Sequence, residues 1–428
     1  MTSITNIKRL FAASLAAVAV SSCDTEVVNP GPIDSSFLDD PASQLAIANG
    51  AGRALADALN WISYTSAAIA REVHPSGSTG SFGISPNQQD GRLEEDEVGA
   101  HWSFSHRARF LATNGLERID GLDPADQDQE QLAQLYLWAG FTHRLLGESM
   151  CQAVIDGGAQ QSHRVHLNDA LAAFNQAASF GDSEVQNAAI AGRASVHVQL
   201  GDWDSAVADA TRIQPGMSFV MPYFSIGDDA QANRIHRASR AQPYKAHTTR
   251  FTWVEGYGQE PTGSPYGDPR IPYVVTGTYG DAATGCCGSV DFNPQQKHGD
   301  DDSPIELASY EEMQLIIAED LILHRDDIQG GMAIINSLRT AAGMNAESAG
   351  TLTEAMTFLK REHAIEMWLE GRRLAALRRW NATQTPGDLH PLEQVGDGNN
   401  TTGSHLETRD FCFPISEAEW DTNPNLTR

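Results

Sequence analysis

Several histidines and carboxylates lie close enough in the sequence to share a site. His363 and Glu366 are three residues apart and would lie on adjacent turns of a helix. In the inverse HxxEH motif of metalloproteases the two histidines bind zinc and the glutamate is the general base, but Met367 stands where the second histidine would be. We therefore expect His363 and Glu366 to take part in structural ion pairs.

Two further groups of side chains could hold a cation. His163 and His166 have a spacing that can chelate a metal, but no third ligand is evident, and we expect them on a solvated helix face. Asp300, Asp301 and Asp302 could bind calcium, yet the EF-hand spacing and its distal glutamate are absent. The sequence also has no Gly-x-Ser-x-Gly motif and no phosphate loop, and nothing selects a pair of glycosidase carboxylates. We predict no catalytic residue, no bound metal and no cofactor.

Composition excludes some classes of partner. The chain has 428 residues, a formal net charge of −27 and an isoelectric point near 4.7. Such a surface repels the phosphates of nucleic acids and anionic lipid headgroups, so we expect neither as an electrostatic partner. Hydrophobic residues make up 41% of the chain, which is enough for a core. The length allows one large domain or about two to three ordinary ones.

The N-terminus has the pattern of a bacterial lipoprotein signal. Lys8 and Arg9 precede an apolar run over residues 10–20, which is too short to span a bilayer. Val20-Ser21-Ser22-Cys23 resembles a lipobox. The sequence thus predicts a signal peptide over residues 1–22, acylation of Cys23 and a polar tether over residues 23–40. The protein would contact the membrane through its lipid anchor only.

Four cysteines remain after Cys23, namely Cys151, Cys286, Cys287 and Cys412. Export to an oxidising compartment permits disulfides. Cys286 and Cys287 are adjacent and could form a strained vicinal bridge or pair separately elsewhere. No CxxC or Cys/His spacing indicates a zinc site. We expect at least one structural disulfide and leave the pairing open.

Apolar and small residues recur three or four apart over much of the chain, which predicts a mainly α-helical protein. A first helix is expected from Pro41 to about residue 70, before a loop rich in glycine and serine over residues 74–80. A helix over residues 101–116 and helical hairpins over about residues 126–215 follow. In these hairpins, small residues recur at a spacing close to the tetratricopeptide period of about 34 residues.

Residues 222–304 differ from the rest of the chain. They are rich in Gly, Pro, Tyr and Asp and show no sustained helical period, although residues 249–254 could form a short strand. A long irregular stretch inside a domain is usually functional or disordered, and the density of aromatic residues argues against disorder. Helices resume over about residues 305–380, with individual helices expected over residues 310–324 and 333–342.

Residues 361–380 carry an unusual density of charge, and we expect one helix to run through them. Thr351 and Glu354 have the spacing of a capping box at its start. Three glutamates fall four residues apart and four arginines follow, namely Glu362, Glu366, Glu370, Arg372, Arg373, Arg378 and Arg379. Because aromatic residues flank the segment, we expect part of this network to be half-buried, where removal of one partner is costly.

The same segment carries a family resemblance. Arg-Glu-x-x-x-Glu-x-x-x-Glu-Gly-x-Arg-x-x-x-Leu-x-Arg-Trp over residues 361–380 resembles the C-terminal signature of SusD/RagB proteins. Asp268-Pro269-Arg270, Tyr310 with Met313, and the closing Pro414-Ile415 and Asn423-Pro424-Asn425-Leu426 are similar to motifs of that family and occur in its order. Together with the lipobox and the hairpins, these motifs cover nearly the whole chain.

The resemblance implies a SusD-like fold, mainly α, with tetratricopeptide-like hairpins and a long irregular loop-rich region in a single domain over residues 41–428. Family members are surface lipoproteins that capture nutrients, usually glycans, for a TonB-dependent transporter. The expected function is therefore binding of an oligosaccharide or other nutrient at the cell surface, on the outer membrane, and its delivery to a SusC-like transporter. No enzymatic step is expected.

Flat aromatic side chains match the apolar faces of sugar rings, and neighbouring polar groups bind hydroxyls. The resemblance places the ligand surface in the loops after the first helix and in the central irregular region. We predict that Trp102, Trp253 and Tyr257 contact the ligand, with Arg71 and His74 as polar neighbours. For each aromatic residue the alternative is packing in the core.

Two other functions fit the sequence. The first is a helical-repeat scaffold that binds only protein, and the second is a surface glycoside hydrolase. The sequence does not identify the glycan.

Overall fold

The computed structural model describes residues 35–225, 231–241, 245–257, 267–280, 289–396 and 406–428. The predicted signal peptide, Cys23, Cys286 and Cys287 lie outside these residues. The end of the predicted tether is described: it forms a short 3-10 helix, η1 (Ser35–Asp39), whose Asp39 is paired with Arg118.

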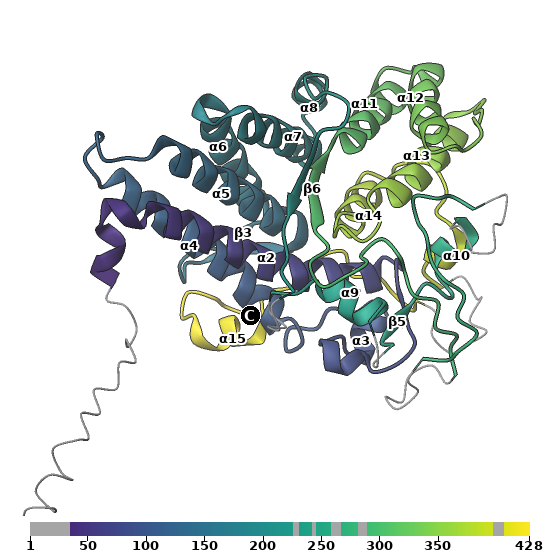
Figure 1. The fold of residues 1–428 in the computed structure, drawn as a ribbon. Helices are drawn as coiled ribbons and strands as arrows, with labels where there is room; N and C mark the ends of the chain where they lie inside the picture. Colours follow the sequence, from purple (N-terminus) through teal and green to yellow (C-terminus); the bar gives the residue numbers. More distant parts are fainter. Residues whose placement is uncertain (1–34, 226–230, 242–244, 258–266, 281–288, 397–405) are drawn as a thin grey trace, which may run out of the picture.

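The described part of the chain is mainly α-helical, as the sequence predicts (Figure 1). Its α-helices are α2 (Gln44–Ile69), α3 (Pro86–Gln89), α4 (Gly99–Asp120), α5 (Gln129–Ser149), α6 (Arg164–Phe180), α7 (Ser183–Leu200), α8 (Trp203–Ala210), α9 (Arg234–Ser239), α10 (Trp253–Tyr257), α11 (Tyr310–His324), α12 (Ile328–Ala341), α13 (Leu352–Glu366), α14 (Arg373–Ala382) and α15 (Glu417–Thr422). None of the described helices is long and apolar enough to span a membrane.

Helices α5 to α8 form the predicted hairpins and pack in sequence order, with α2 and α4 against α5 (Figure 1). Aspartates at the N-caps, among them Asp182, accept hydrogen bonds from the first backbone N–H groups and so fix where these helices begin. The ring of Phe174 on α6 lies between Gly140 of α5 and Gly192 of α7, and a Cβ at either glycine would lie 2.5 Å from that ring. The absence of side chains there lets three helices share one buried aromatic residue.

The irregular central region begins and ends at one small sheet. Strand β4 (Ser218–Met221) pairs antiparallel with β6 (Ile305–Ser309), and β6 leads directly into α11. Two other pairs are present among the described residues: β2 (Gln152–Val154) with β3 (Gln160–Ser162), and β1 (His74–Pro75) with β5 (His247–Thr248). Because β4 and β6 are hydrogen-bonded to each other, the irregular region between them starts and ends at the same place on the helical scaffold.

The strand expected over residues 249–254 is wrong. The chain turns at Phe251, which has a positive φ of 60°, and Trp253 then begins the short helix α10. The Thr252 hydroxyl donates to the Thr249 carbonyl at 2.7 Å and closes this turn. Local side-chain hydrogen bonds therefore favour a turn here.

The single helix expected through residues 361–380 is also wrong. The predicted capping box of Thr351 and Glu354 opens α13, but α13 ends at Glu366 and α14 begins at Arg373. Between them Leu369 and Gly371 both have positive φ angles, of 61° and 74°. The Leu369 N–H donates to the Glu72 carboxylate at 2.9 Å, so a tertiary contact stabilises the break.

Replacing Gly371 by alanine should destabilise the protein by about 2–3 kcal/mol, because a side chain is disfavoured at positive φ and this one would also collide with α2. A Cβ at Gly371 would lie 2.9 Å from Ser63 Cβ. Gly201 has a similar φ of 78° but open space around it. Gly201→Ala should therefore cost only about 1 kcal/mol. Urea denaturation of both variants measures the difference, and equal losses would show that the Ser63 contact has no effect.

A disulfide joins Cys151, just after α5, to Cys412 near the chain's end, with 5.0 Å between the Cα atoms. The backbone pairs at the same place, since the Cys151 N–H donates to the Phe413 carbonyl at 2.9 Å. The expectation of at least one structural disulfide is confirmed, and this pairing is now assigned.

Candidate functional site

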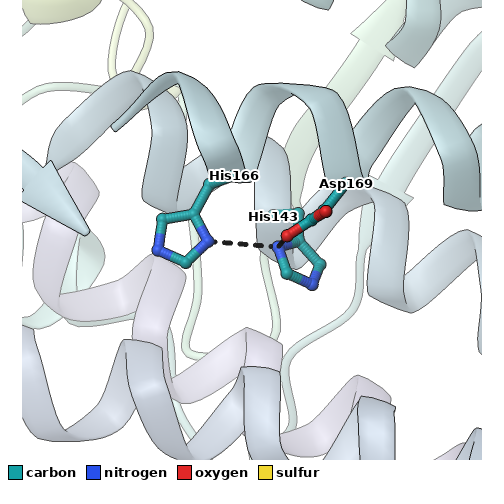
Figure 2. A group of neighbouring side chains, drawn as sticks. All are labelled: His143, His166 and Asp169. Carbon is teal, nitrogen blue, oxygen red and sulfur yellow. Dashed lines mark hydrogen bonds and ion pairs between the residues drawn. The ribbon is translucent and has the colours of Figure 1, made fainter. Parts of the chain in front are cut away.

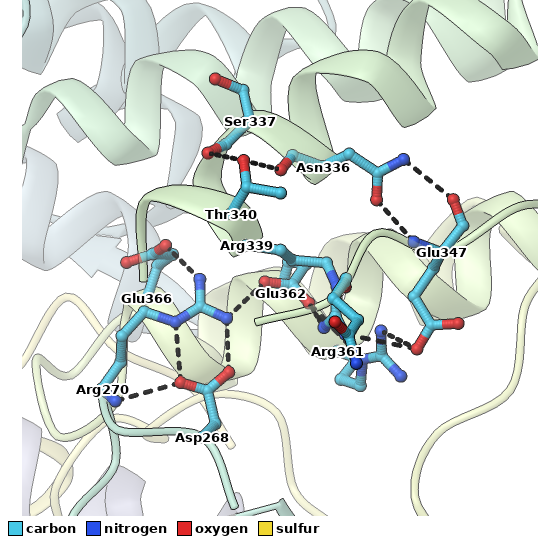
Figure 3. Close-up of polar contacts among 11 residues, drawn as sticks. Asp268, Arg270, Asn336, Ser337, Arg339, Thr340, Glu347, Arg361, Glu362 and Glu366 are labelled. Carbon is cyan, nitrogen blue, oxygen red and sulfur yellow. Dashed lines mark hydrogen bonds and ion pairs between the residues drawn. The ribbon is translucent and has the colours of Figure 1, made fainter. Parts of the chain in front are cut away.

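A buried ionic network fastens the loop-rich region to α13 (Figure 3). Glu362 is fully buried and accepts hydrogen bonds from Arg270 at 2.8 Å and Arg339 at 2.7 Å. Arg270 also donates to Asp268 and Glu366, each at 2.5 Å. The Asp-Pro-Arg loop and α12 are therefore both held by α13, and the expected ionic network is present and more deeply buried than expected.

Other charged side chains of residues 361–380 also form ion pairs with residues far away in the sequence, and not with residues one turn along the same helix. Glu370 binds Lys297 at 2.5 Å, and Arg373 donates two hydrogen bonds to Glu393 at 2.7 and 2.8 Å. Burial raises the pKa of Glu366 to about 7, against the effect of the Arg270 guanidinium. Because these groups bind one another in buried pairs, we interpret the network as structural.

A cavity of about 210 Å³ lies next to this network, between α10, α13 and the 3-10 helix η5 (Pro391–Glu393). We call it the Tyr257 cavity. Tyr257 is half-buried in its wall, and the His390 ring meets the Tyr257 ring edge-on with centroids 4.9 Å apart. The Arg361 guanidinium from α13 lies 5.9 Å from the Tyr257 centroid, and Asp388 contributes an exposed carboxylate. An aromatic face, a cation, an imidazole and a carboxylate thus surround one hollow.

Local sequence explains this arrangement. Gly256 lies so close to His390 that a Cβ would be 2.7 Å from the imidazole Nε2, so a larger residue before Tyr257 would displace the His390 ring. Burial raises the pKa of the Tyr257 hydroxyl and lowers the pKa of His390. Both groups are therefore neutral near pH 7 and can hydrogen bond to a neutral polar ligand.

The five predicted ligand residues do not form one site. Trp253 and Tyr257 lie together, with ring centroids 6.5 Å apart, and both line the Tyr257 cavity. Trp253 is fully buried, however, and Trp102, Arg71 and His74 are also buried. Of the five predicted residues, Tyr257 alone is half-buried, and the burial of the other four favours the alternative of packing in the core.

Packing accounts for the buried side chains. His74 forms strand β1, and its ring contacts Phe251 with centroids 5.5 Å apart, so the loop after α2 is covered by the region around β5. The Trp102 and His106 rings are in contact at a tilt of 40° with centroids 4.3 Å apart, and the Trp102 indole N–H donates to Glu419 at 3.4 Å. Trp102 and His74 therefore stabilise the fold and do not line the cavity.

Arg361, His390 and Asp388 were not among the predicted site residues. Arg361 stood at the start of the charged segment, which was predicted to form an ionic network. His390 and Asp388 lie in a connection between α14 and η5 whose sequence carries no motif.

Comparisons with known proteins agree on the fold. Residues 310–428 match the model of the SusD family. A SusD superfamily protein from Bacteroides vulgatus has 17% identity, a TM-score of 0.63 and coverage of 91% of this chain and 98% of its own. A SusD-like protein from Bacteroides fragilis has 12% identity, a TM-score of 0.66 and coverage of 92% and 98%. No curated protein sequence matches the chain significantly.

The C-terminal part of the chain, residues 310–428, is therefore similar in sequence to the SusD family, and the chain shares the fold of SusD-like proteins. Residues 310–428, the part that matches the SusD model, supply α13 and η5 and hence two walls of the Tyr257 cavity. The third wall, with Tyr257 itself, comes from the central region outside the match. The helical part of the site therefore supplies Arg361, and the irregular region supplies the aromatic ring of Tyr257.

Two further solved structures share the fold. A SusD-like carbohydrate-binding protein from Bacteroides vulgatus has 14% identity, a TM-score of 0.63 and coverage of 90% of this chain and 97% of its own. Surface glycan-binding protein A from Bacteroides uniformis has 13% identity, a TM-score of 0.61 and coverage of 89% and 98%.

Proposed function

We propose that this protein binds an oligosaccharide in the Tyr257 cavity and delivers it to a TonB-dependent outer-membrane transporter. The observation that carries the proposal is the placement of Tyr257, Arg361 and His390 around one open hollow. Two proteins of the same fold are described as carbohydrate- or glycan-binding, which supports a ligand of this class.

The cavity suits part of a glycan. Its volume of about 210 Å³ is below the range of roughly 300–1,000 Å³ typical of sites that enclose a drug-sized ligand. We infer that one sugar unit enters, with an apolar C–H face on the exposed part of the Tyr257 ring. The rest of the chain would extend outward past the exposed Asp388.

We propose capture without bond chemistry. Glycoside hydrolysis needs a proton-donating carboxyl group and a second carboxylate facing it across the scissile bond. Glu393, the buried carboxylate of the cavity, is held by two hydrogen bonds from Arg373. Such a bidentate pair occupies both carboxylate oxygens, which does not suit a general acid that must reach the glycosidic oxygen.

The proposed location is the cell surface. Acylation of Cys23 would anchor the chain in the outer membrane, and residues 24–40 would separate the domain from the lipid. We propose a single domain from residue 41 onward that acts beside its SusC-like transporter.

Tyr257→Ala should weaken oligosaccharide binding at least about tenfold, equivalent to about 1.4 kcal/mol, because it removes the only predicted aromatic contact that keeps exposed surface. The measurement is calorimetric titration of a soluble form that begins at Asp24 against a broad panel of glycans and peptides. Recovery of the bound glycan at unchanged length would test for hydrolysis in the same samples.

Tyr279 provides the matched control, since it is a tyrosine of the same loop-rich region, is 60% exposed and does not line the cavity. Tyr279→Ala should bind as the unmodified protein does. Equal weakening by both variants would contradict the assignment of the cavity, and shortened glycan would contradict capture without chemistry. Absence of binding to every glycan and peptide of the panel would contradict the proposed function.

A further inference from the structure

Three side chains with metal-binding atoms converge at the α5–α6 interface, away from the Tyr257 cavity (Figure 2). His143 comes from α5, and His166 and Asp169 come from α6. The two imidazole Nδ1 atoms are 3.2 Å apart, and His143 Nδ1 lies 3.7 Å from an Asp169 carboxylate oxygen. All three potential ligand atoms lie within 4.8 Å of one another.

The helices hold these side chains in place. His166 and Asp169 are three residues apart and so share a face of α6. Gly147 of α5 lets α6 approach closely, because a Cβ there would lie 2.5 Å from the Leu167 side chain. The solvated helix face expected for His163 and His166 is wrong for His166, which is fully buried. His163 takes no part in this group, because its Nδ1 forms a hydrogen bond with Arg378 Nη2 at 3.2 Å.

The spacing fits a tetrahedral transition metal. Zn²⁺ binds imidazole nitrogen and carboxylate oxygen at about 2.0–2.2 Å, which places neighbouring ligand atoms about 3.3–3.6 Å apart. The distances of 3.2 and 3.7 Å lie close to that range. A set of two imidazoles and one carboxylate suits Zn²⁺, whereas Ca²⁺ and Mg²⁺ prefer oxygen ligands throughout.

The surroundings suit a buried site with access from solvent. His143 and His166 are both buried. Asp169 is exposed, which gives a metal ion a path from solvent. Arg109 is the nearby charge that opposes a cation, and its ion pair with Asp156 offsets part of that repulsion.

We propose that His143, His166 and Asp169 form a Zn²⁺ site that joins α5 to α6, with a fourth position open to water or to an exogenous ligand. The site is separate from glycan capture. It would stabilise the first hairpin, because a metal that binds only the folded state raises the free energy of unfolding.

Titration of the metal-free full-length mature chain with Zn²⁺ tests this proposal, with Co²⁺ absorption to report tetrahedral nitrogen and oxygen ligation. We expect one equivalent to bind and the unfolding temperature to rise. Asp169→Asn and His166→Ala should each weaken Zn²⁺ affinity at least about tenfold. Because Asp169 is exposed, Asp169→Asn should still fold, and it tests the site even if the buried substitution His166→Ala prevents folding.

His197→Asn is the matched control, because His197 also lies beside an aspartate, Asp202 at 3.3 Å, but belongs to no three-ligand group among the described residues. This variant should bind Zn²⁺ as the unmodified chain does. Arg109→Gln should tighten binding, since it removes the opposing charge. Absence of Zn²⁺ binding, or binding that Asp169→Asn and His166→Ala leave unchanged, would overturn the proposal.

Discussion

Replacing Glu362 by glutamine should lower the free energy of unfolding by about 3–5 kcal/mol, the cost of removing one partner from a buried ion pair. Glu362 is fully buried and bonded to Arg270 and Arg339, which come from the loop-rich region and from α12. Both guanidinium groups would lose their shared anion in a site that water does not reach. Urea denaturation followed by circular dichroism measures the loss.

Glu347→Gln is the matched control. Glu347 also binds Arg339, at 3.3 Å, and Arg361, at 3.4 Å, but its side chain is 36% exposed. An exposed pair contributes about 0–1 kcal/mol, so this variant should be almost as stable as the unmodified protein. Similar losses for the two glutamates would show that burial of the network does not determine its contribution.

The double variant Cys151→Ser with Cys412→Ser should lose about 2–5 kcal/mol of stability. The disulfide closes a loop over 261 residues of sequence separation and fastens the end of the chain beside α5. Without it the unfolded chain gains conformational freedom, and the contact between Cys151 and Phe413 rests on backbone hydrogen bonds alone. Urea denaturation without reductant measures this loss.

Reduction of the unmodified protein provides the comparison, because it should reproduce the loss seen in the variant. Mass spectrometry of a non-reduced digest should recover a peptide that joins Cys151 to Cys412. An unchanged denaturation midpoint in the variant, or linkage of these cysteines to other partners, would contradict the assignment.

Local sequence signals predicted a helix well where nearby residues alone determine its ends. Apolar periodicity and N-cap residues located α11 and the hairpins, and the capping box located the start of α13. The break between α13 and α14 could not be predicted in this way. It depends on Leu369 bonding to Glu72 and on Gly371 packing against Ser63, and both partners lie in the distant first part of the chain.

The candidate site was predicted only in part, for a similar reason. The irregular, aromatic-rich region suggested Tyr257 and Trp253 alike, because residue type alone does not separate a half-buried ring from a fully buried one. Arg361 and His390 reach the same hollow only because α13 and η5 are folded against α10. His143 joins His166 and Asp169 only through the packing of α5 on α6.

The crystal structure of the mature protein with its best-binding oligosaccharide tests the central claim most directly. We expect one sugar ring in the Tyr257 cavity, with its C–H face on Tyr257 and its hydroxyls within hydrogen-bond distance of Arg361 or His390. Glycan bound at another surface, with the Tyr257 cavity holding only solvent, would contradict the proposed mode of capture.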